Sequence, residues 1–180
     1  MLNLLSLQLG KQTNEVIVML QEYRNILVPV DGSYGAELAF KKSVAVAKRN
    51  KAHLHIVHVI DTRTFQDISS FDPSIINEVT EKTKVNLEKY VVKAKNEGLE
   101  EVDYSIEYGS PKTIIAKDLP EQLGTDLIMI GATGLNDVER LLVGSVTEYV
   151  TRNAATDVLV VRTNLENQLV SPKDEKKHTN

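Results

Sequence analysis

The chain contains no cysteine, which excludes disulfide bonds, thiolate zinc sites and cysteine nucleophiles and permits a reducing compartment. It has no excess of basic residues either. Its 21 Lys and Arg stand against 25 Asp and Glu, for a formal net charge of -4, so we expect no nucleic-acid partner. No apolar run approaches the roughly 18 residues of a membrane span, and no basic segment precedes the apolar start. We therefore expect a cytoplasmic protein without a membrane anchor.

The length of 180 residues suits one domain with one core, and 42% hydrophobic with 26% charged residues is typical of a globular protein. We expect this domain at residues 24–163, after an N-terminal extension at 1–23. Residues 164–180 are polar, charge-dense and interrupted by Pro172, so they are predicted to form a disordered tail.

Short apolar runs alternate with longer helical patterns along the domain, which is typical of βαβ units with a parallel sheet. Strands are predicted at 25–30, 52–61, 102–109, 126–131 and 157–162. Helices are predicted at 36–50, 74–96, 111–123 and 145–153. Ser33 is expected to cap the first helix, and Gly98 to end the second.

These elements predict an α/β fold, with one open five-stranded parallel sheet and helices on both faces. Right-handed crossovers give the strand order 3-2-1-4-5. The first, fourth and fifth strands are continuously apolar, so both their faces should be covered, whereas the third alternates and suits an edge. Ligands bind such sheets where the winding reverses, here between the first and fourth strands, which end near Asp31 and Gly131.

The stretch GATGLNDVERLLVGSVTE, residues 131–148, places three glycines around that point. Gly131 and Gly134 permit positive φ and close backbone approach, and Gly144-Ser145 opens a helix whose N-terminus favours an anion such as phosphate. No Lys follows Gly144, which excludes a Walker A loop, and the spacing is not that of the G-x-G-x-x-G fingerprint.

The spacing G, two residues, G, nine residues, G, then Ser or Thr resembles the nucleotide motif of the universal stress protein family. The segments NILVPVDGS, IVHVID and GSP at 109–111 resemble other family segments in the same order, so the resemblance covers nearly all of 24–162. It implies a Rossmann-like fold similar to that of the adenine nucleotide alpha hydrolases, ATP binding, homodimers and a role in the stress response.

The resemblance also implies a set of nucleotide-binding residues. Adenine would contact Pro29, Val30 and the backbone of Val59. The ribose would lie near Asp31 and Gly131. The phosphates, with Mg²⁺ held through them, would contact Gly134, Gly144, Ser145, Val146 and Thr147.

The loop departs from many family members in its charge. Thr133 stands where many loops carry His, and Leu135 and Asn136 stand where a basic residue is common, so that only Arg140 is cationic. Fewer charge-assisted hydrogen bonds weaken the hold on a triphosphate, which keeps AMP and ADP as alternatives to ATP.

Structural roles compete with several of these assignments. Ser145 begins a capping box, S-V-T-E, in which it would bond the amide of Glu148, and Asp31 suits a turn before the first helix. His53 and His55 share one strand face and His58 lies on the other, so the three cannot converge on a metal.

No Ser-His-Asp order, carboxylate pair or general base beside the loop follows from spacing, so we expect no dedicated enzyme. The alternatives are a dimeric interaction module that does not bind nucleotide and a weak ATP-hydrolysing enzyme of the same fold. The motifs of ATP-pyrophosphatases and nucleotidyl transferases are absent from VPVDGSYGAE.

The last strand, 157–162, predicts a partner. At the edge of the sheet it would expose an apolar row with unpaired backbone groups, which proteins normally cover. Pairing with the same strand of a second copy satisfies both edges, so we expect a homodimer through this strand. The sequence identifies no downstream protein partner.

Overall fold

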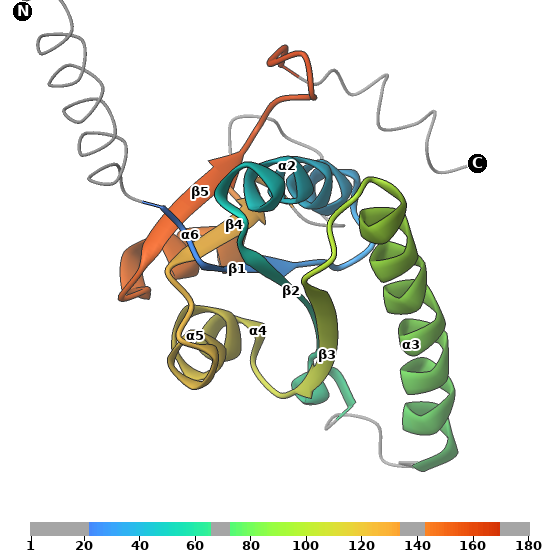
Figure 1. Cartoon of the computed structure of the whole chain (residues 1–180). Coiled ribbons are helices and arrows are strands. Elements are labelled where there is room, and N and C mark those ends of the chain that lie inside the picture. The colour runs from blue at the N-terminus through green and yellow to red at the C-terminus, as the bar shows by residue number, and fades with distance from the viewer. Residues whose placement is uncertain (1–21, 66–72, 134–142, 170–180) are drawn as a thin grey trace, which may run out of the picture.

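The computed structural model describes residues 22–65, 73–133 and 143–169. Five parallel strands form one sheet in the order β3-β2-β1-β4-β5, as Figure 1 shows. The strands are β1 (Asn25–Pro29), β2 (His53–Ile60), β3 (Val102–Tyr108), β4 (Leu127–Gly131) and β5 (Asp157–Val161). The predicted fold class and strand order are confirmed.

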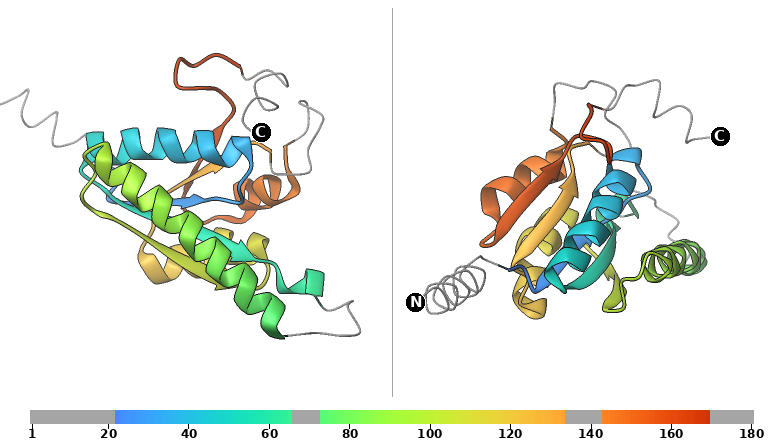
Figure 2. Two further views of the ribbon diagram at one scale, coloured as in Figure 1. Left: turned by 90° about the vertical axis from the view of Figure 1, so that its right-hand side faces the viewer. Right: turned by 45° about the horizontal axis from the view of Figure 1, so that its top comes forward.

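Helices cover both faces of this sheet (Figure 2). On one face lie α2 (Tyr34–Asn50) and α3 (Pro73–Asn96), and on the other lie α4 (Pro111–Thr113), η2 (Ile114–Asp118), α5 (Leu119–Leu123) and α6 (Ser145–Asn153). A short 3-10 helix, η1 (Thr62–Phe65), follows β2. Within the described ranges, no helix combines the length and the apolarity that crossing a membrane requires.

Single residues explain where α2 begins and why the helical segment after β3 is irregular. The Ser33 side chain accepts a hydrogen bond from the Ala36 amide at 3.1 Å, so the predicted cap of α2 is confirmed. The predicted helix at 111–123 is interrupted, because η2 is a π-helical turn that ends at Asp118, two residues before Pro120. Proline lacks the N–H that would continue the regular ladder, which gives a physical reason for the wider turn.

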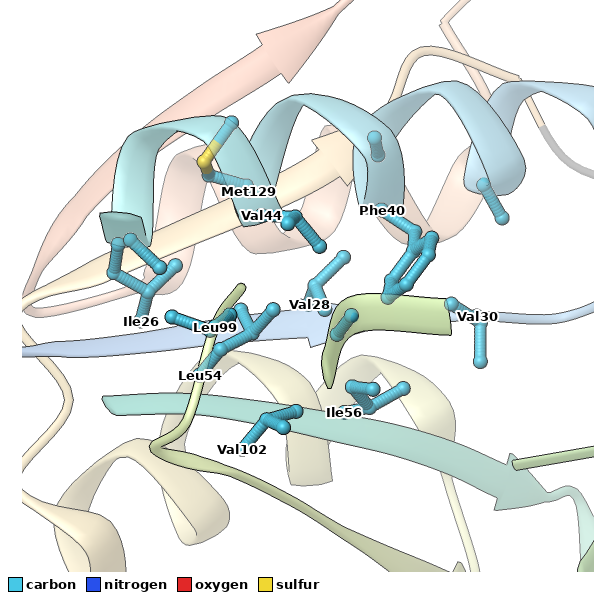
Figure 3. Close-up of a cluster of buried hydrophobic side chains, with 14 of the residues drawn as sticks. Ile26, Val28, Val30, Phe40, Val44, Leu54, Ile56, Leu99, Val102 and Met129 are labelled. Atoms are coloured by element: carbon cyan, nitrogen blue, oxygen red, sulfur yellow. The ribbon is translucent and has the colours of Figure 1, made fainter. Parts of the chain in front are cut away.

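The main core lies between the sheet and helices α2 and α3. Figure 3 shows Phe40 and Val44 of α2 directed toward the sheet, where Val28 and Ile56 lie, and all four are 0% exposed. Each such side chain contributes about 1.5–3 kcal/mol of burial free energy. A second cluster, which includes Val57 and Ile115, fills the other face under η2, α5 and α6. The pocket described below opens at the end of this second cluster.

The expectation that three strands are covered on both faces holds for β1 and β4 but is wrong for β5. The side chains of β4 are all buried, whereas Leu159 of β5 is 42% exposed. Leu159 lies beside Met129 in the sheet, on the side where α2 packs. Because α2 packs mainly over β4 and β1, it leaves this face of the edge strand uncovered.

The residues that flank the predicted domain make contacts with it at both ends. Tyr23 already packs on the main core, and its hydroxyl donates to Asp157 at 3.0 Å, while residues 1–21 lie outside the described residues. At the other end, residues 164–169 of the predicted tail are described: Leu169 pairs with Thr163 in a β-bridge, and the Lys42 ammonium donates to Asn167 Oδ1 at 3.1 Å. The prediction of disorder for 170–180 concerns residues outside the described ranges.

Candidate functional site

A pocket of about 510 Å³ lies beyond the carboxyl ends of β1, β2 and β4, at the predicted point where the winding of the sheet reverses. This volume falls within the range of about 300–1,000 Å³ that is usual for small-molecule sites. Nine of the ten predicted binding residues line it: Pro29, Val30, Asp31, Val59, Gly131, Gly144, Ser145, Val146 and Thr147. The tenth, Gly134, lies outside the described residues.

The pocket has further lining residues that were not among the ten predicted binding residues. These are Ser33, Ala36, Val57, Asp61, Pro111, Ile115, Ile130 and Thr133. Side-chain alternation along β2, extended from Val59, predicts two of them, because Val57 and Asp61 share its parity. Pro111 and Ile115 come from the segment after β3, and no local pattern indicates that this segment packs beside β1 and β4.

The apolar part of the pocket also presents backbone groups. The Val30 amide donates to the Val57 carbonyl at 2.8 Å, so the odd-numbered residues of β2 direct their N–H and C=O toward β1. In the register of the two strands, residue 31 would pair with Val59, but β1 ends two residues earlier, at Pro29. The N–H and C=O of Val59 therefore face the pocket, between side chains such as Val57 and Ile115.

Asp31 has a structural role in addition to its place in the pocket. Its Oδ1 accepts the Ser33 amide at 2.9 Å across Gly32, which has a positive φ of 85°. The turn that competes with the predicted ligand role is therefore present. The Asp31 side chain nevertheless lines the pocket and is exposed, and a carboxylate offers about four acceptor positions.

Gly131 is required by the packing of a helix. A Cβ at this position would lie 2.6 Å from the backbone carbon of Gly35, and a Cβ at Gly35 would lie 2.7 Å from the Thr133 carbonyl oxygen. The first turn of α2 thus touches the end of β4 backbone to backbone. Gly131 is not among the described glycines with positive φ, so of the two predicted reasons for this glycine only close approach applies, and the approaching group is α2.

The N-terminus of α6 forms the opposite wall. Gly144 is the N-cap, with φ -57° and ψ 147°, and its carbonyl accepts the Glu148 amide at 2.8 Å. The predicted capping box is therefore wrong, because Ser145 is the first helical residue and stands one position too late to cap. Its exposed side chain and the first-turn amides, which lack intrahelical acceptors, border the pocket.

Thr147 acts on the shape of this wall. Its side chain is 3% exposed, and its hydroxyl donates to the Gly131 carbonyl at 2.8 Å. The Gly144 amide donates to the Ala132 carbonyl, also at 2.8 Å. These two bonds hold the start of α6 against the end of β4, so the helix N-terminus is fixed relative to the strand end.

The charged side chains of the described lining are two aspartates, with no Lys or Arg among them. Asp61 is paired with Arg63, which donates from Nε to Oδ1 at 2.8 Å and from its terminal nitrogen to Oδ2 at 2.5 Å. The hydrogen bond from the Arg63 guanidinium holds the pKa of Asp61 below its ordinary value. The described lining therefore offers carboxylate acceptors, and the N-terminus of α6 is the part of its wall that favours an anion.

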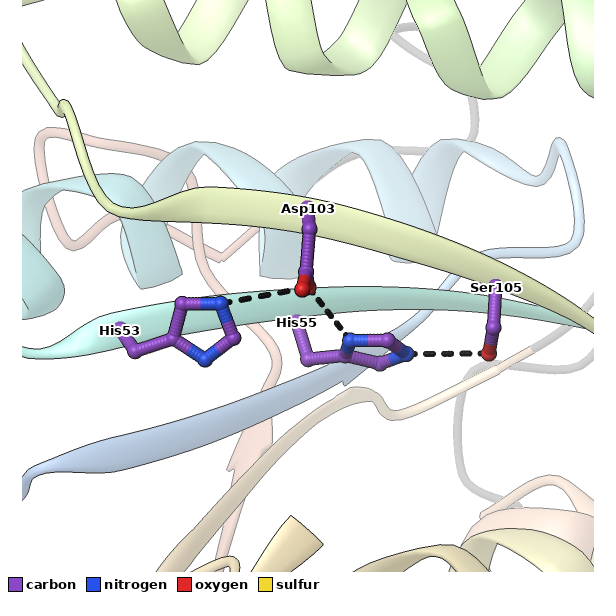
Figure 4. Close-up of polar contacts among 4 residues, drawn as sticks. All are labelled: His53, His55, Asp103 and Ser105. Atoms are coloured by element: carbon purple, nitrogen blue, oxygen red, sulfur yellow. Dashed lines mark hydrogen bonds and ion pairs between the residues drawn. The ribbon is translucent and has the colours of Figure 1, made fainter.

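A second polar region lies on the same sheet face, nearer the start of β2 (Figure 4). His55 stands between Asp103, whose Oδ1 is 2.5 Å from Nδ1, and Ser105, whose Oγ is 2.9 Å from Nε2. His53 Nε2 is 3.3 Å from the same Asp103 oxygen. We call these four residues the cross-strand array.

The cross-strand array has the connectivity of a Ser-His-Asp triad without its setting. The Asp103 side chain is 58% exposed, and none of the four residues lines the pocket. His58 lies apart, with Nδ1 2.7 Å from the Val30 carbonyl oxygen. Among the described residues, no three His, Asp or Glu side chains are grouped so as to hold a metal ion.

Comparison with known proteins identifies the class to which the fold and pocket belong. The sequence profile of the Universal stress protein family matches residues 22–162, so the chain belongs to this family. A putative universal stress protein of Staphylococcus epidermidis is 50% identical over 141 residues, which are 78% of this chain and 85% of the relative.

Solved structures agree with this assignment. The universal stress protein UspA from Lactobacillus plantarum is 33% identical, with a TM-score of 0.66 over 79% of this chain and 99% of its own. A universal stress protein crystallised in complex with cAMP is 23% identical, with a TM-score of 0.60 over 78% of this chain and 98% of its own. The second likeness concerns the fold alone.

Proposed function

We propose that the pocket binds an adenine nucleotide, and that the protein is a cytoplasmic, homodimeric nucleotide-binding module of the stress response rather than a dedicated enzyme. The observation that carries this proposal is the convergence of nine residues, selected by a family motif spread from position 29 to 147, on one pocket. The cAMP complex of a protein with the same fold is consistent with it. Candidate ligands are ATP, ADP and AMP.

The base fits the apolar end of the pocket. Pro29, Val57 and Ile115 supply flat and aliphatic surface, and the backbone N–H and C=O of Val59 can exchange two hydrogen bonds with the edge of adenine. Adenine presents an acceptor nitrogen next to an amino donor, which matches one N–H and one C=O.

The ribose and phosphates follow from the geometry of the other walls. The Asp31 carboxylate can accept hydrogen bonds from ribose hydroxyls while keeping its bond to the Ser33 amide. The phosphates would meet the amides of Ser145, Val146 and Thr147, whose helix N-terminus attracts negative charge. Since the described lining has no basic side chain, Mg²⁺ held through the phosphates would supply the positive charge that a triphosphate needs.

The dimer partner would cover β5. This strand is an edge of the sheet, and one of its faces carries the exposed Leu159. A second copy that pairs with it across a two-fold axis would satisfy the open backbone groups of both edges.

Two alternatives make different predictions. A dimeric interaction module with an empty pocket is favoured by the absence of Lys and Arg from the described lining. A weak ATP-hydrolysing enzyme would need a group that orients a water against the phosphates. In the described part of the pocket, the ionisable side chains are Asp31 and Asp61. Each already accepts a hydrogen bond from the protein, Asp31 from the Ser33 amide and Asp61 from Arg63.

The test is to denature the purified protein and to identify any released nucleotide by chromatography, in parallel with Gly144→Val. Gly144 has backbone angles that valine also adopts, so this change narrows the phosphate wall without requiring a new backbone conformation. The matched control is Ala154→Val, at the other end of the same helix and with similar angles, φ -67° and ψ 141°.

Stoichiometric adenine nucleotide in the wild type and in Ala154→Val, but not in Gly144→Val, is the expected result. The number of phosphates on the released nucleotide distinguishes ATP from ADP and AMP. An empty wild type that also shows no thermal shift with millimolar AMP or Mg-ATP would favour the interaction module instead.

A further inference from the structure

The ladder between β1 and β2 stops one hydrogen bond early. In a parallel pair, a residue donates to one partner and accepts from the residue two positions further along. The Val30 amide donates to the Val57 carbonyl at 2.8 Å, so the regular continuation would have the Val30 carbonyl accept from the Val59 amide. The strand register instead ends at Pro29 and Val57.

The His58 side chain takes the place of that missing donor. Its Nδ1 is 2.7 Å from the Val30 carbonyl oxygen, and since a carbonyl only accepts, Nδ1 must carry the proton. A neutral ring in this tautomer and a protonated ring both donate here. The Val30 carbonyl is thus satisfied without the Val59 N–H.

His58 does not line the pocket, because its side chain has the opposite parity to Val57 and Val59 along β2. It acts from the other face of the sheet, by deciding which donor the Val30 carbonyl receives. Any effect on a ligand therefore passes through the backbone of Val30 and Val59.

We propose that His58 is a positioning residue of the pocket: by holding the Val30 carbonyl, it keeps the Val59 N–H out of the β1–β2 ladder and leaves it available to the ligand base. The part of this inference that concerns the base rests on the proposed nucleotide binding. The part that concerns the ladder stands on the contacts of the protein alone.

Three variants separate the ladder from general stability. His58→Leu keeps a side chain of similar reach and removes the donor, so the Val30 carbonyl becomes free to accept the Val59 N–H. His58→Asn keeps an N–H at the same branch position as Nδ1. His53→Leu is the control, since it removes another β2 histidine, one that contacts Asp103 away from the pocket.

The first measurement is amide hydrogen exchange of Val59 by NMR, without nucleotide. We expect fast exchange in the wild type, His58→Asn and His53→Leu, and exchange slowed by about tenfold or more in His58→Leu. A Val59 amide already protected in the nucleotide-free wild type would overturn the ladder part, and this outcome needs no variant.

The second measurement is the affinity for AMP and Mg-ATP by calorimetry, with thermal unfolding of the same samples. We expect His58→Leu to weaken binding by about tenfold, the value of one hydrogen bond, with no greater loss of thermal stability than His53→Leu. His58→Asn should bind within about twofold of the wild type.

Each outcome bears on a different statement. Equal nucleotide affinity of wild type and His58→Leu would overturn the role of His58 while the proposed function stands. No binding by the wild type would overturn the proposed function and the base part of the inference, while the exchange of Val59 would still test the ladder.

Discussion

The pocket and the cross-strand array lie on the same face of the same sheet and contain similar groups, yet they differ in what the backbone offers. At the array, β2 and β3 are fully paired, and His55 has a partner on each ring nitrogen. At the pocket, β1 and β4 end, so Val59 and the start of α6 direct backbone groups into a volume of about 510 Å³.

The difference teaches that connectivity between side chains is a weak sign of function by itself. In the cross-strand array, an aspartate and a serine occupy both ring nitrogens of His55 across two strands, and none of these residues lines the pocket. A site requires space and unsatisfied groups together, and the sheet supplies both where its strands diverge. The following changes test this contrast, from the largest expected effect to the smallest.

The largest effect should come from Gly131→Ala, which disturbs the backbone contact that shapes the pocket. The added Cβ would lie 2.6 Å from the backbone of Gly35, and backbone atoms cannot rotate away. We expect a loss of about 3 kcal/mol or more in the free energy of unfolding, measured with urea, together with loss of nucleotide binding.

Gly124→Ala is the matched control, since a Cβ there meets nothing within 4 Å and only the positive φ of 60° is strained. We expect it to cost about 1 kcal/mol. A smaller cost for Gly131→Ala than for this control would contradict the packing role of Gly131.

The next effect concerns the other open row of backbone groups, at β5. The Ala132 amide donates to the Val161 carbonyl, so the odd-numbered residues of β5 face β4 and the Val160 N–H faces outward. Val160→Pro removes that N–H and leaves the ladder to β4 intact. Because a two-fold interface loses the bond twice, we expect dimerisation to weaken by about 100-fold in light scattering.

Val160→Thr keeps the N–H with a side chain of similar shape and should stay dimeric. If Val160→Pro remains as dimeric as this control, pairing through β5 is excluded and the partner surface lies elsewhere.

The sequence predicts the parts of this contrast that depend on local patterns. Apolar runs such as the one that forms β4 locate the strands, and alternation with helices fixes their order, so Asp31 and Gly131 fall at the site by topology alone. The cap at Ser33 is also local, since one side chain and one amide three residues later define it.

The parts that were missed depend on how elements meet. Pro111 and Ile115 enter the pocket only through the packing of their helical segment. The contact of His55 with Asp103 requires the register of β2 against β3, which spacing does not contain. The capping box predicted at Ser145 is wrong because Gly144 and Ser145 both suit an N-cap position. The structure has Gly144 as the N-cap, and its carbonyl accepts the hydrogen bond from the Glu148 amide.

A pair of matched aspartate changes sharpens the contrast further. Asp31→Asn keeps an Oδ1 for the Ser33 amide but loses the charge and one acceptor, so we expect nucleotide affinity to fall about tenfold with little change in stability. Asp103→Asn should leave the affinity unchanged and lower the free energy of unfolding by about 1 kcal/mol. Calorimetry measures the affinity and urea denaturation the stability of both variants. If Asp103→Asn lowered the affinity and Asp31→Asn did not, the ligand would bind at the cross-strand array and not in the pocket.

The smallest effect is a pH dependence in the groove between α2 and α3, away from both regions. Glu37 is partly buried, which opposes its ionisation and is the largest single influence on its pKa. The hydrogen bond and charge of Lys93, whose Nζ is 2.5 Å from Oε1, together with Tyr90 and Lys41 outweigh burial and hold this pKa below its ordinary value. A lowered carboxylate pKa stabilises the fold above the unfolded value of about 4.3, and this stability is lost as the pH falls through the lower folded value. We expect the free energy of unfolding of the wild type to exceed that of Glu37→Gln by about 1 kcal/mol or less at pH 7, measured with urea, and this difference to shrink below pH of about 4.

AMP affinity is the control for this prediction. Since Glu37 does not line the pocket, AMP affinity at pH 7 should be the same in both proteins, and a difference would mean that the α2–α3 groove and the pocket are coupled.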